Sequence, residues 1–461
     1  MNRSARTEHA GRRRRWSLLM GGAALALVAA ACGSSVAPAS PSSSSSSGAA
    51  PTASITVWWV TNGTNVNDMW DSIAKTFDAQ HPGDKVTIDI QPSSNSYKQK
   101  LLTALAGSTP PALFFTWGGG PMQQYIAANS IQPMGDPGQN DAGNPSWKSD
   151  FLAASLQPVT FNGKIYGMPI LGTQPVFFFY NKKVLSDAGL SFPTTFSALL
   201  NDCSTFNAKG ITPIALGNAD QWEGLMYLEY LADRIGGPKA FDNIQNNQPN
   251  AWSQPAIQQA LTDIQTLARD KCFNSGYDSV TYTNGSTDAM VYGGKAAMQL
   301  MGDWDLGGIQ SDDPAIINSN GIGIGKFPTV TGGTGNPADL VGNTTSYTGL
   351  AAHISKAQTY VAEQFMQYFY TDAYATAEIA NGQVPVISGT SSYLGSSSLA
   401  SYLEPIYQDV ANAPSFQYSW DQALGPTKAT PMLSNLANVF ELTETPQQMA
   451  AAMNPYQKTS S

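Results

Sequence analysis

Strand-like and helical patterns alternate between residues 55 and 116, and this alternation limits the possible folds more than any other feature. Three stretches rich in β-branched and aromatic side chains are predicted strands, at residues 55–60, 86–90 and 113–116. Residues 69–80 and 96–106, which lie between them, have the apolar spacing of helices. This order predicts an α/β fold built on a mainly parallel sheet.

Polar and aromatic side chains follow two of these predicted strands. Asn62 and Asn65 come after the first strand, and Trp117 comes after the third. Sheets of this class bind ligands beyond the carboxyl ends of their strands, so all three residues are candidate ligand contacts. The alternative role for the two asparagines is turn formation, which asparagine favours.

A second α/β pattern begins near residue 176 and continues to the end of the chain. Its predicted strands cover residues 176–182 and 297–301. Its predicted helices cover residues 221–235, 254–269 and 363–380, and the part after residue 398 is mostly helical and irregular.

The composition excludes several classes of protein. Charged residues are only 12% of the 461 residues, about half the usual share, and the formal net charge is −9. So small a share of charged residues disfavours a coiled coil. A nucleic-acid partner is disfavoured because the basic surface that phosphate backbones require is missing. With three His and three Cys, neither a metal site, a cofactor site nor a His-based catalytic apparatus stands out.

Residues 1–31 have the pattern of a secretory signal peptide. Four arginines at positions 12–15 precede an apolar run at residues 18–31, which is too short to span a bilayer comfortably. The run ends in Ala29-Ala30-Ala31-Cys32-Gly33, which resembles the lipobox of bacterial lipoproteins, although that box usually has Leu where Ala29 stands. The alternative is an ordinary secreted protein cut nearby.

The lipobox resemblance implies that the chain is cut before Cys32 and that the Cys32 thiol carries a lipid. Residues 32–54 are then a flexible linker, because their Ser- and Pro-rich sequence has nothing to bury. Cys203 and Cys272 remain as an even pair, which predicts a disulfide outside the cytosol. The alternative is two buried free thiols.

Six groups of residues, in chain order, resemble the extracellular solute-binding proteins of family 1, the sugar-binding subunits of ABC importers. The resemblance covers nearly all of residues 55–461. The groups are Ser96-Tyr97-Lys98, residues 111–120, residues 167–170 with 179–183, residues 214–218 with Trp222, residues 293–298 with Gly302-Asp303-Trp304, and residues 362–366.

This resemblance implies an α/β, two-lobed fold like that of periplasmic binding proteins. The lobes are discontinuous, are joined by crossing strands and have a central ligand cleft between them. Carried over to this sequence, lobe one is expected at residues 55–172 and 330–385. Lobe two is expected at residues 173–329 and 386–461.

The resemblance also implies which residues meet the ligand. Trp304 resembles the aromatic residue that stacks on a sugar face in this family, and Trp420 with Asp421 resembles its late aromatic segment. Trp222 starts a predicted helix, with Asp220 nearby as a hydroxyl partner. Aromatic rings suit the C–H faces of a sugar, and Asp, Asn or Gln side chains suit its hydroxyl rim. Two further candidates lie at the expected crossings, Gln174 at the first and Asn343 near the second.

The implied function is a receptor on the outer face of the cytoplasmic membrane, held there by its lipid. It captures a neutral carbohydrate, with an oligosaccharide favoured by the several aromatic residues, and delivers it to the membrane permease of an ABC importer. It is expected to be a monomer and not an enzyme. The alternatives are a receptor of the same fold for a non-sugar solute such as a polyol, and a secreted glycoside hydrolase, which needs a pair of carboxylates.

Overall fold

The computed structural model describes residues 50–457, apart from residues 93–94 and 283–284. The expected signal peptide, Cys32 and most of the 32–54 linker lie outside the described residues. Among the residues that are described, no helix combines the length and the apolar character needed to cross a membrane.

The first sheet has six strands in the order β2-β1-β3-β13-β4, with β7 also paired to β13. β1 pairs in parallel with β2 and β3, as the alternating pattern predicts, whereas β13 is antiparallel to β3, β4 and β7. The strands are β1 (Ser54–Val60), β2 (Lys85–Gln91), β3 (Leu113–Thr116), β4 (Ile131–Gln132), β7 (Gly167–Pro169) and β13 (Tyr347–Ala351). The helices around this sheet are α1 (Thr64–Gln80), α2 (Asn95–Leu105), α3 (Gly119–Ala127), α4 (Ala153–Leu156), α13 (Lys356–Met366) and α14 (Asp372–Ala380). A two-stranded ribbon joins β5 (Thr160–Phe161) to β6 (Lys164–Ile165).

Tryptophan packing holds α1 and α13 against the first sheet. Successive side chains of β1 face opposite sides, so Trp59 is fully buried while Trp58 is partly exposed. The ring centroid of Trp59 lies 4.8 Å from that of Trp70 on α1 and 6.0 Å from that of Phe365 on α13. Because each ring buries a large apolar area, these contacts stabilise the packing of α1 and α13 on β1.

The second sheet also has six strands, in the order β14-β12-β8-β10-β9, with β11 paired to β8. They are β8 (Gln174–Asn181), β9 (Thr212–Ala215), β10 (Ala296–Gly302), β11 (Ile322–Gly325), β12 (Leu340–Asn343) and β14 (Phe416–Tyr418). β8 is antiparallel to β10, β11 and β12. Every residue of β10 is buried, and Gln299 is the polar side chain within its otherwise apolar sequence.

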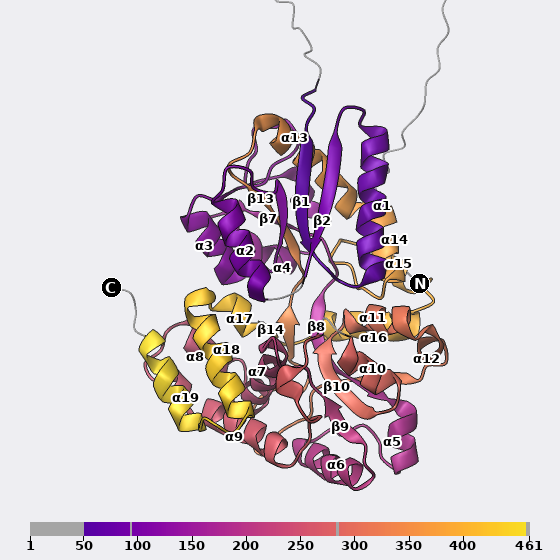
Figure 1. Ribbon diagram of the computed structural model, residues 1–461, viewed down its shortest axis with the longest axis vertical. Coiled ribbons are helices and arrows are strands. Elements are labelled where there is room, and N and C mark those ends of the chain that lie inside the picture. The colour runs from indigo at the N-terminus through magenta and orange to yellow at the C-terminus, as the bar shows by residue number, and fades with distance from the viewer. Residues whose placement is uncertain (1–49, 93–94, 283–284, 458–461) are drawn as a thin grey trace, which may run out of the picture. The chain divides into compact units, whose positions relative to one another are not determined.

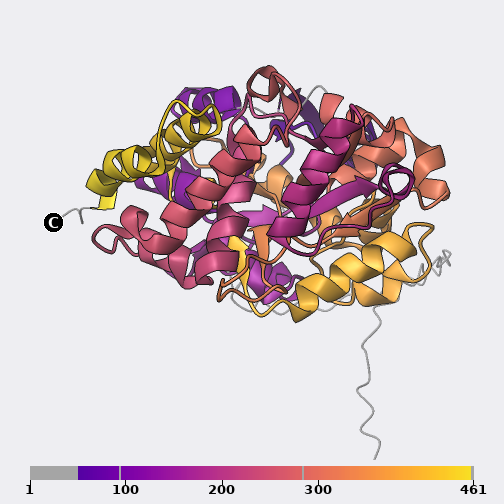
Figure 2. The ribbon, with the colours of Figure 1, turned by 90° about the horizontal axis from the view of Figure 1, so that it is seen from below.

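Many helices cover the second sheet, and Figure 2 shows α16 and α18 on different sides of this part of the molecule. The helices are α5 (Lys182–Ala188), α6 (Phe196–Ala208), α7 (Trp222–Gly236), α8 (Lys239–Gln245), α9 (Pro255–Arg269), α10 (Ser286–Tyr292), α11 (Asp305–Asp312), α12 (Pro314–Asn318), α15 (Ser391–Leu394), α16 (Ala400–Asn412), α17 (Trp420–Ala423), α18 (Pro426–Phe440) and α19 (Pro446–Met453).

Cys203 on α6 and Cys272 after α9 form a disulfide, as the cysteine count predicts. Their Cα atoms are 5.1 Å apart, and 69 residues separate them in the sequence. Closing a loop of this length is worth about 4 kcal/mol through the entropy of the unfolded chain.

The two sheets have separate hydrophobic cores, so the chain forms two lobes (Figure 1). It crosses between them at residues 170–173 and 344–346, and again between residues 375 and 394, a stretch that contributes to both cores. Residues 340–343, expected in lobe one, form β12 of the second sheet, because the buried pair Leu340 and Val341 completes the core of lobe two. Conversely, Val386 and Ile387, expected in lobe two, pack in the core of lobe one. Ile379 and Val384, also expected in lobe one, pack in the core of lobe two. The other predicted lobe limits stay predictions.

Candidate ligand-binding site

A cavity of about 290 Å³ lies between the two lobes, and both lobes contribute to its lining. Lobe one supplies the carboxyl ends of β1 and β3 and the loop that leads into α1. Lobe two supplies the N-terminal half of α7 and parts of α10, α11 and α17. The cavity thus lies where ligands bind in sheets of this class.

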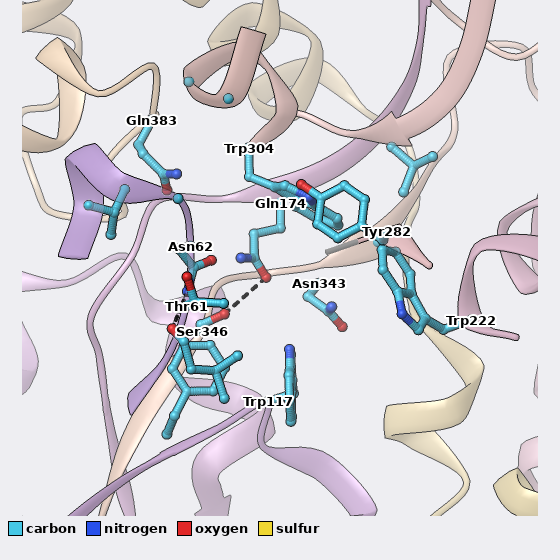
Figure 3. A pocket seen from close by; sticks show the side chains of 18 of the residues that line it. Thr61, Asn62, Trp117, Gln174, Trp222, Tyr282, Trp304, Asn343, Ser346 and Gln383 are labelled. Atoms are coloured by element: carbon cyan, nitrogen blue, oxygen red, sulfur yellow. Dashed lines mark hydrogen bonds between the residues drawn. The ribbon is translucent and has the colours of Figure 1, made fainter. Parts of the chain in front are cut away.

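Three aromatic side chains of lobe two form one side of the cavity, which we call the aromatic wall. They are Trp222, Tyr282 and Trp304, and Figure 3 shows them gathered together. The ring centroid of Trp222 lies 5.3 Å from that of Tyr282 and 6.2 Å from that of Trp304, with interplanar angles of 76° and 52°. The inclined rings give the wall several faces on which apolar surfaces of a ligand can stack.

Amide and hydroxyl side chains line the rest of the cavity, and Figure 3 shows Asn62 and Ser346 on the side away from Trp222 and Tyr282. Gln174 at the start of β8 accepts a hydrogen bond through Oε1 from Ser346 Oγ at 3.2 Å, which joins two crossings. Asn62 donates to the carbonyl oxygen of Val60 at 2.9 Å. The Oδ1 atom of Asn343 is buried and has no hydrogen-bond partner within the described part of the chain, so it is available to a ligand donor.

Four carboxyl groups also line the cavity, those of Glu229, Asp288, Asp312 and Asp421. Burial raises the pKa of Glu229 to about 8, and burial also raises the pKa of Asp288. Asp421 on α17 forms an ion pair with Lys98 on α2, with 3.3 Å between Oδ2 and Nζ. This pair links the two lobes at the edge of the cavity, where the Lys98 ammonium also lies 4.9 Å from the ring centroid of Trp117.

The structure brings most of the predicted site residues together around this cavity. The predicted residues in its lining are Trp117, Trp222, Trp304, Asp421, Gln174, Asn62, Asn65 and Asn343. That these residues contact a ligand stays a prediction.

Trp420 is not in the cavity lining, and its predicted placement was wrong. Its side chain is fully buried in lobe two, where the ring stacks on Phe241 with a centroid distance of 4.6 Å. The indole Nε1 donates to Gln417 Oε1 at 2.6 Å. These contacts hold Trp420 in the core, and only the next residue, Asp421, reaches the cavity.

Asp220 also lies outside the cavity lining, in the turn before α7. Gln221 adopts a left-handed φ of 70°, and this turn separates Asp220 from the cavity residue Trp222. Burial raises the pKa of Asp220 above its ordinary value.

Sequence reasoning missed several residues of the lining, above all Tyr282, Asp288 and Asp312. No motif marks them, because Tyr282 lies in the connection before α10 and the two aspartates lie on the short helices α10 and α11. Lys98 was also missed, although it belongs to one of the groups that resemble the solute-binding family. Within the described ranges, no group of three or more His, Cys, Asp or Glu is arranged to hold a metal ion.

Comparison with known proteins gives the same picture of the fold. A model of the family of bacterial extracellular solute-binding proteins matches residues 63–376. A solved structure from work on xylan utilization by the thermophilic bacterium Caldanaerobius polysaccharolyticus is 26% identical, with a TM-score of 0.77. The alignment covers 88% of this chain and 100% of that one.

Two curated relatives match shorter stretches. An uncharacterized ABC transporter extracellular-binding protein of Pyrococcus horikoshii is 27% identical over 256 residues, which are 54% of this chain and 55% of that protein. The diacetylchitobiose binding protein of Streptomyces coelicolor is 31% identical over 157 residues, or 34% of each chain. The chain therefore spans about half, or less, of the length of these relatives.

Proposed function

We propose that this chain, which belongs to the family of bacterial extracellular solute-binding proteins, is the carbohydrate receptor of an ABC importer. The observation that carries the proposal is the cavity between the lobes, which is lined by the aromatic wall and by amide and hydroxyl side chains. A sugar has apolar C–H faces and a rim of hydroxyls, and this cavity offers a surface for each. An oligosaccharide is favoured, because Trp117 adds a further ring from the other lobe.

Binding is expected to hold the two lobes together. Residues of both lobes line the cavity, so a ligand makes its full set of contacts only when the lobes are close. The crossings that carry Gln174, Asn343 and Ser346 connect the lobes, and hinge bending there would open the cavity. The closed, loaded form would then dock on the membrane permease of the importer.

We expect binding without chemical change to the sugar. The Streptomyces relative is named for binding diacetylchitobiose, and the Pyrococcus relative for extracellular binding in an ABC transporter. These names support a receptor over the hydrolase alternative. The protein is proposed to act as a monomer, because one chain supplies both sides of the cavity.

The test is a thermal-shift screen of the purified protein against xylotriose, N,N′-diacetylchitobiose, raffinose and maltotriose, with glycerol and sorbitol as polyols. A sugar at 100 times its Kd should add about 2.7 kcal/mol of stability. Chromatography of the incubated sugars checks turnover. A shift with one sugar that stays intact supports the receptor, a shift with polyols only supports a polyol receptor, and steady breakdown of a sugar supports the hydrolase.

We further propose that a lipid on Cys32 anchors the receptor outside the cytoplasm, with residues 33–54 as the tether. The apolar run before Cys32 and the small residues next to it support this proposal. Detergent partitioning and mass spectrometry of the N-terminal peptide, compared between the native protein and Cys32→Ser, test it. A wild-type N-terminal peptide without added lipid mass would contradict the anchor.

A further inference from the structure

Two buried aspartates and one glutamine lie next to each other beside the aromatic wall. They are Asp288 on α10, Gln299 on β10 and Asp305, the first residue of α11. Asp288 is 5% exposed, and Gln299 and Asp305 are fully buried. The Gln299 amide Nε2 donates to Asp288 Oδ1 at 3.0 Å and also to Asp305 Oδ2. One amide group therefore joins the two carboxyl groups.

Only Asp288 of these three residues is part of the cavity lining. Its Oδ1 atom accepts from Gln299 and lies 3.4 Å from the Thr287 hydroxyl oxygen. Its Oδ2 atom lies on the side of Gly308, another lining residue, where an added Cβ would be 3.8 Å away. The lack of a side chain at Gly308 thus leaves room for a ligand group beside Oδ2.

The surroundings of the pair are acidic. Four titratable side chains interact with Asp288, namely Asp305 and Asp312 on α11, Tyr292 on α10, and Tyr282 in the connection before α10. Glu223 of α7 in turn interacts with Tyr282. Glu223 and Asp305 each have at least one buried oxygen without a partner in the part of the chain that is described. None of the ion pairs formed by the described residues involves these carboxyl groups.

Two buried carboxyl groups that share one amide hold a single proton more easily than two negative charges. Burial, and then the charge of Asp288, raise the pKa of Asp305 well above its usual range. Burial raises the pKa of Asp288, whereas hydrogen bonds from Gln299 and Asp305 act in the opposite direction. When the pair holds one proton, the larger rise at Asp305 places it there, and Asp288 carries the negative charge.

We infer that Asp288 accepts a hydrogen bond from a ligand hydroxyl beside the aromatic wall, and that Asp305 is a positioning residue that keeps a proton next to it. This inference rests on the proposed carbohydrate-binding function. An ionised carboxylate only accepts hydrogen bonds, so the site requires a free hydroxyl at this point of the sugar. A deoxy or O-methyl sugar would leave the buried carboxylate without its donor and bind more weakly.

The binding test uses calorimetric titration of wild type, Asp288→Asn and Asp305→Asn with xylotriose, N,N′-diacetylchitobiose and raffinose between pH 4.5 and 8. Asp288→Asn should weaken binding by about tenfold to a hundredfold at pH 7.5, because a charged acceptor is lost.

In wild type, binding should weaken as the pH falls and Asp288 gains a proton. In Asp305→Asn, the midpoint of this loss should move to higher pH, because the hydrogen bond from Asp305 that lowers the pKa of Asp288 is replaced by a weaker one from a neutral amide. Asp270→Asn, on the surface outside the cavity, is the matched control.

A second measurement needs no ligand. Because the pKa of Asp305 is raised in the folded state, protonated Asp305 contributes its whole stabilisation below the pKa that it has in the unfolded chain. This contribution is lost as the pH rises toward the folded-state pKa of Asp305. Relative to wild type, the unfolding equilibrium constant of Asp305→Asn should therefore fall about tenfold for each pH unit above about pH 4. Urea unfolding at several pH values measures this gain, and a difference that does not change with pH would contradict the shared proton.

The possible failures are distinguishable. Equal binding of a sugar by wild type and Asp288→Asn would overturn this inference and leave the proposed function intact. An unchanged pH midpoint in Asp305→Asn would overturn the positioning role of Asp305. Failure of wild type to bind every sugar tested would overturn the proposed function, and this inference with it.

Discussion

The position of Trp304 in the aromatic wall depends on the missing side chain of Gly302, two residues earlier. A Cβ added at Gly302 would lie 1.9 Å from Cζ3 of the Trp304 ring. Gly302 is not among the glycines with positive φ, so its backbone would accept alanine. Glycine is therefore required here by the ring and not by the conformation of the chain.

Gly302→Ala should displace the Trp304 ring and weaken sugar binding by about tenfold or more, because a stacked ring loses apolar contact area. Calorimetric titration with the sugar that gives a thermal shift measures the change. Trp58→Phe is the control, since Trp58 lies outside the cavity lining. Binding by Gly302→Ala that equals wild type would show that the ring at position 304 does not contact the sugar.

At the scale of elements, α3 of lobe one meets the α17–α18 connection of lobe two through glycines. A Cβ added at Gly120 would lie 2.3 Å from the Cα of Gly425, and one at Gly119 would lie 2.5 Å from the carbonyl oxygen of Gln422. The Tyr418 hydroxyl donates to the carbonyl oxygen of Trp117 in the same region. Glycine thus lets the two backbones approach closely beside the cavity.

Gly120→Ala should hold the lobes apart and weaken sugar binding by about tenfold, although the residue is outside the cavity lining. The φ of Gly120 is not positive, so alanine adds only the clash. Small-angle scattering should show a smaller radius of gyration on sugar addition for wild type, and a reduced change for the variant. Gly395→Ala, away from this contact, is the control. Normal compaction and affinity in Gly120→Ala would contradict this role for the contact.

At the scale of the whole molecule, buried carboxyl groups make stability depend on pH. Burial raises the pKa of Asp202 to about 6, of Glu363 to about 7, and of Glu229 and Glu378 to about 8. A carboxyl group whose pKa is raised in the folded state contributes its whole stabilisation at pH values below its pKa in the unfolded chain. This stabilisation is lost as the pH rises through the pKa of the folded state. The protein should therefore be more stable at pH 5 than at pH 8.

Glu378→Gln should remove one part of this loss. Glu378 is 3% exposed, and its Oε1 is buried without a partner in the described chain. The variant should gain about 1.4 kcal/mol per pH unit over wild type between pH 5 and pH 8, as an upper limit. Urea unfolding at four pH values measures the gain. A constant difference between the two proteins would mean that Glu378 ionises normally in the folded state.

The sequence predicted the elements better than the side-chain directions. Apolar patterns identified β8 and β10 to within about two residues, because their buried runs are long. One helix expected at residues 363–380 is in fact α13 and α14, because the Thr371 side chain caps α14 by accepting a hydrogen bond from the Tyr374 amide. The direction of the Trp420 side chain could not be predicted from the sequence either, because its packing on Phe241, which is distant in the sequence, decides that it faces the core.

A sugar that lies between the lobes should contact an aromatic ring from each, Trp117 from lobe one and Trp304 from lobe two. Calorimetric titration of wild type, Trp117→Ala and Trp304→Ala with the sugar found by thermal shift tests this claim directly. We predict that each substitution alone weakens binding by about tenfold or more, while the melting temperature without sugar changes little. Unchanged affinity in either variant would contradict a sugar held between the two lobes.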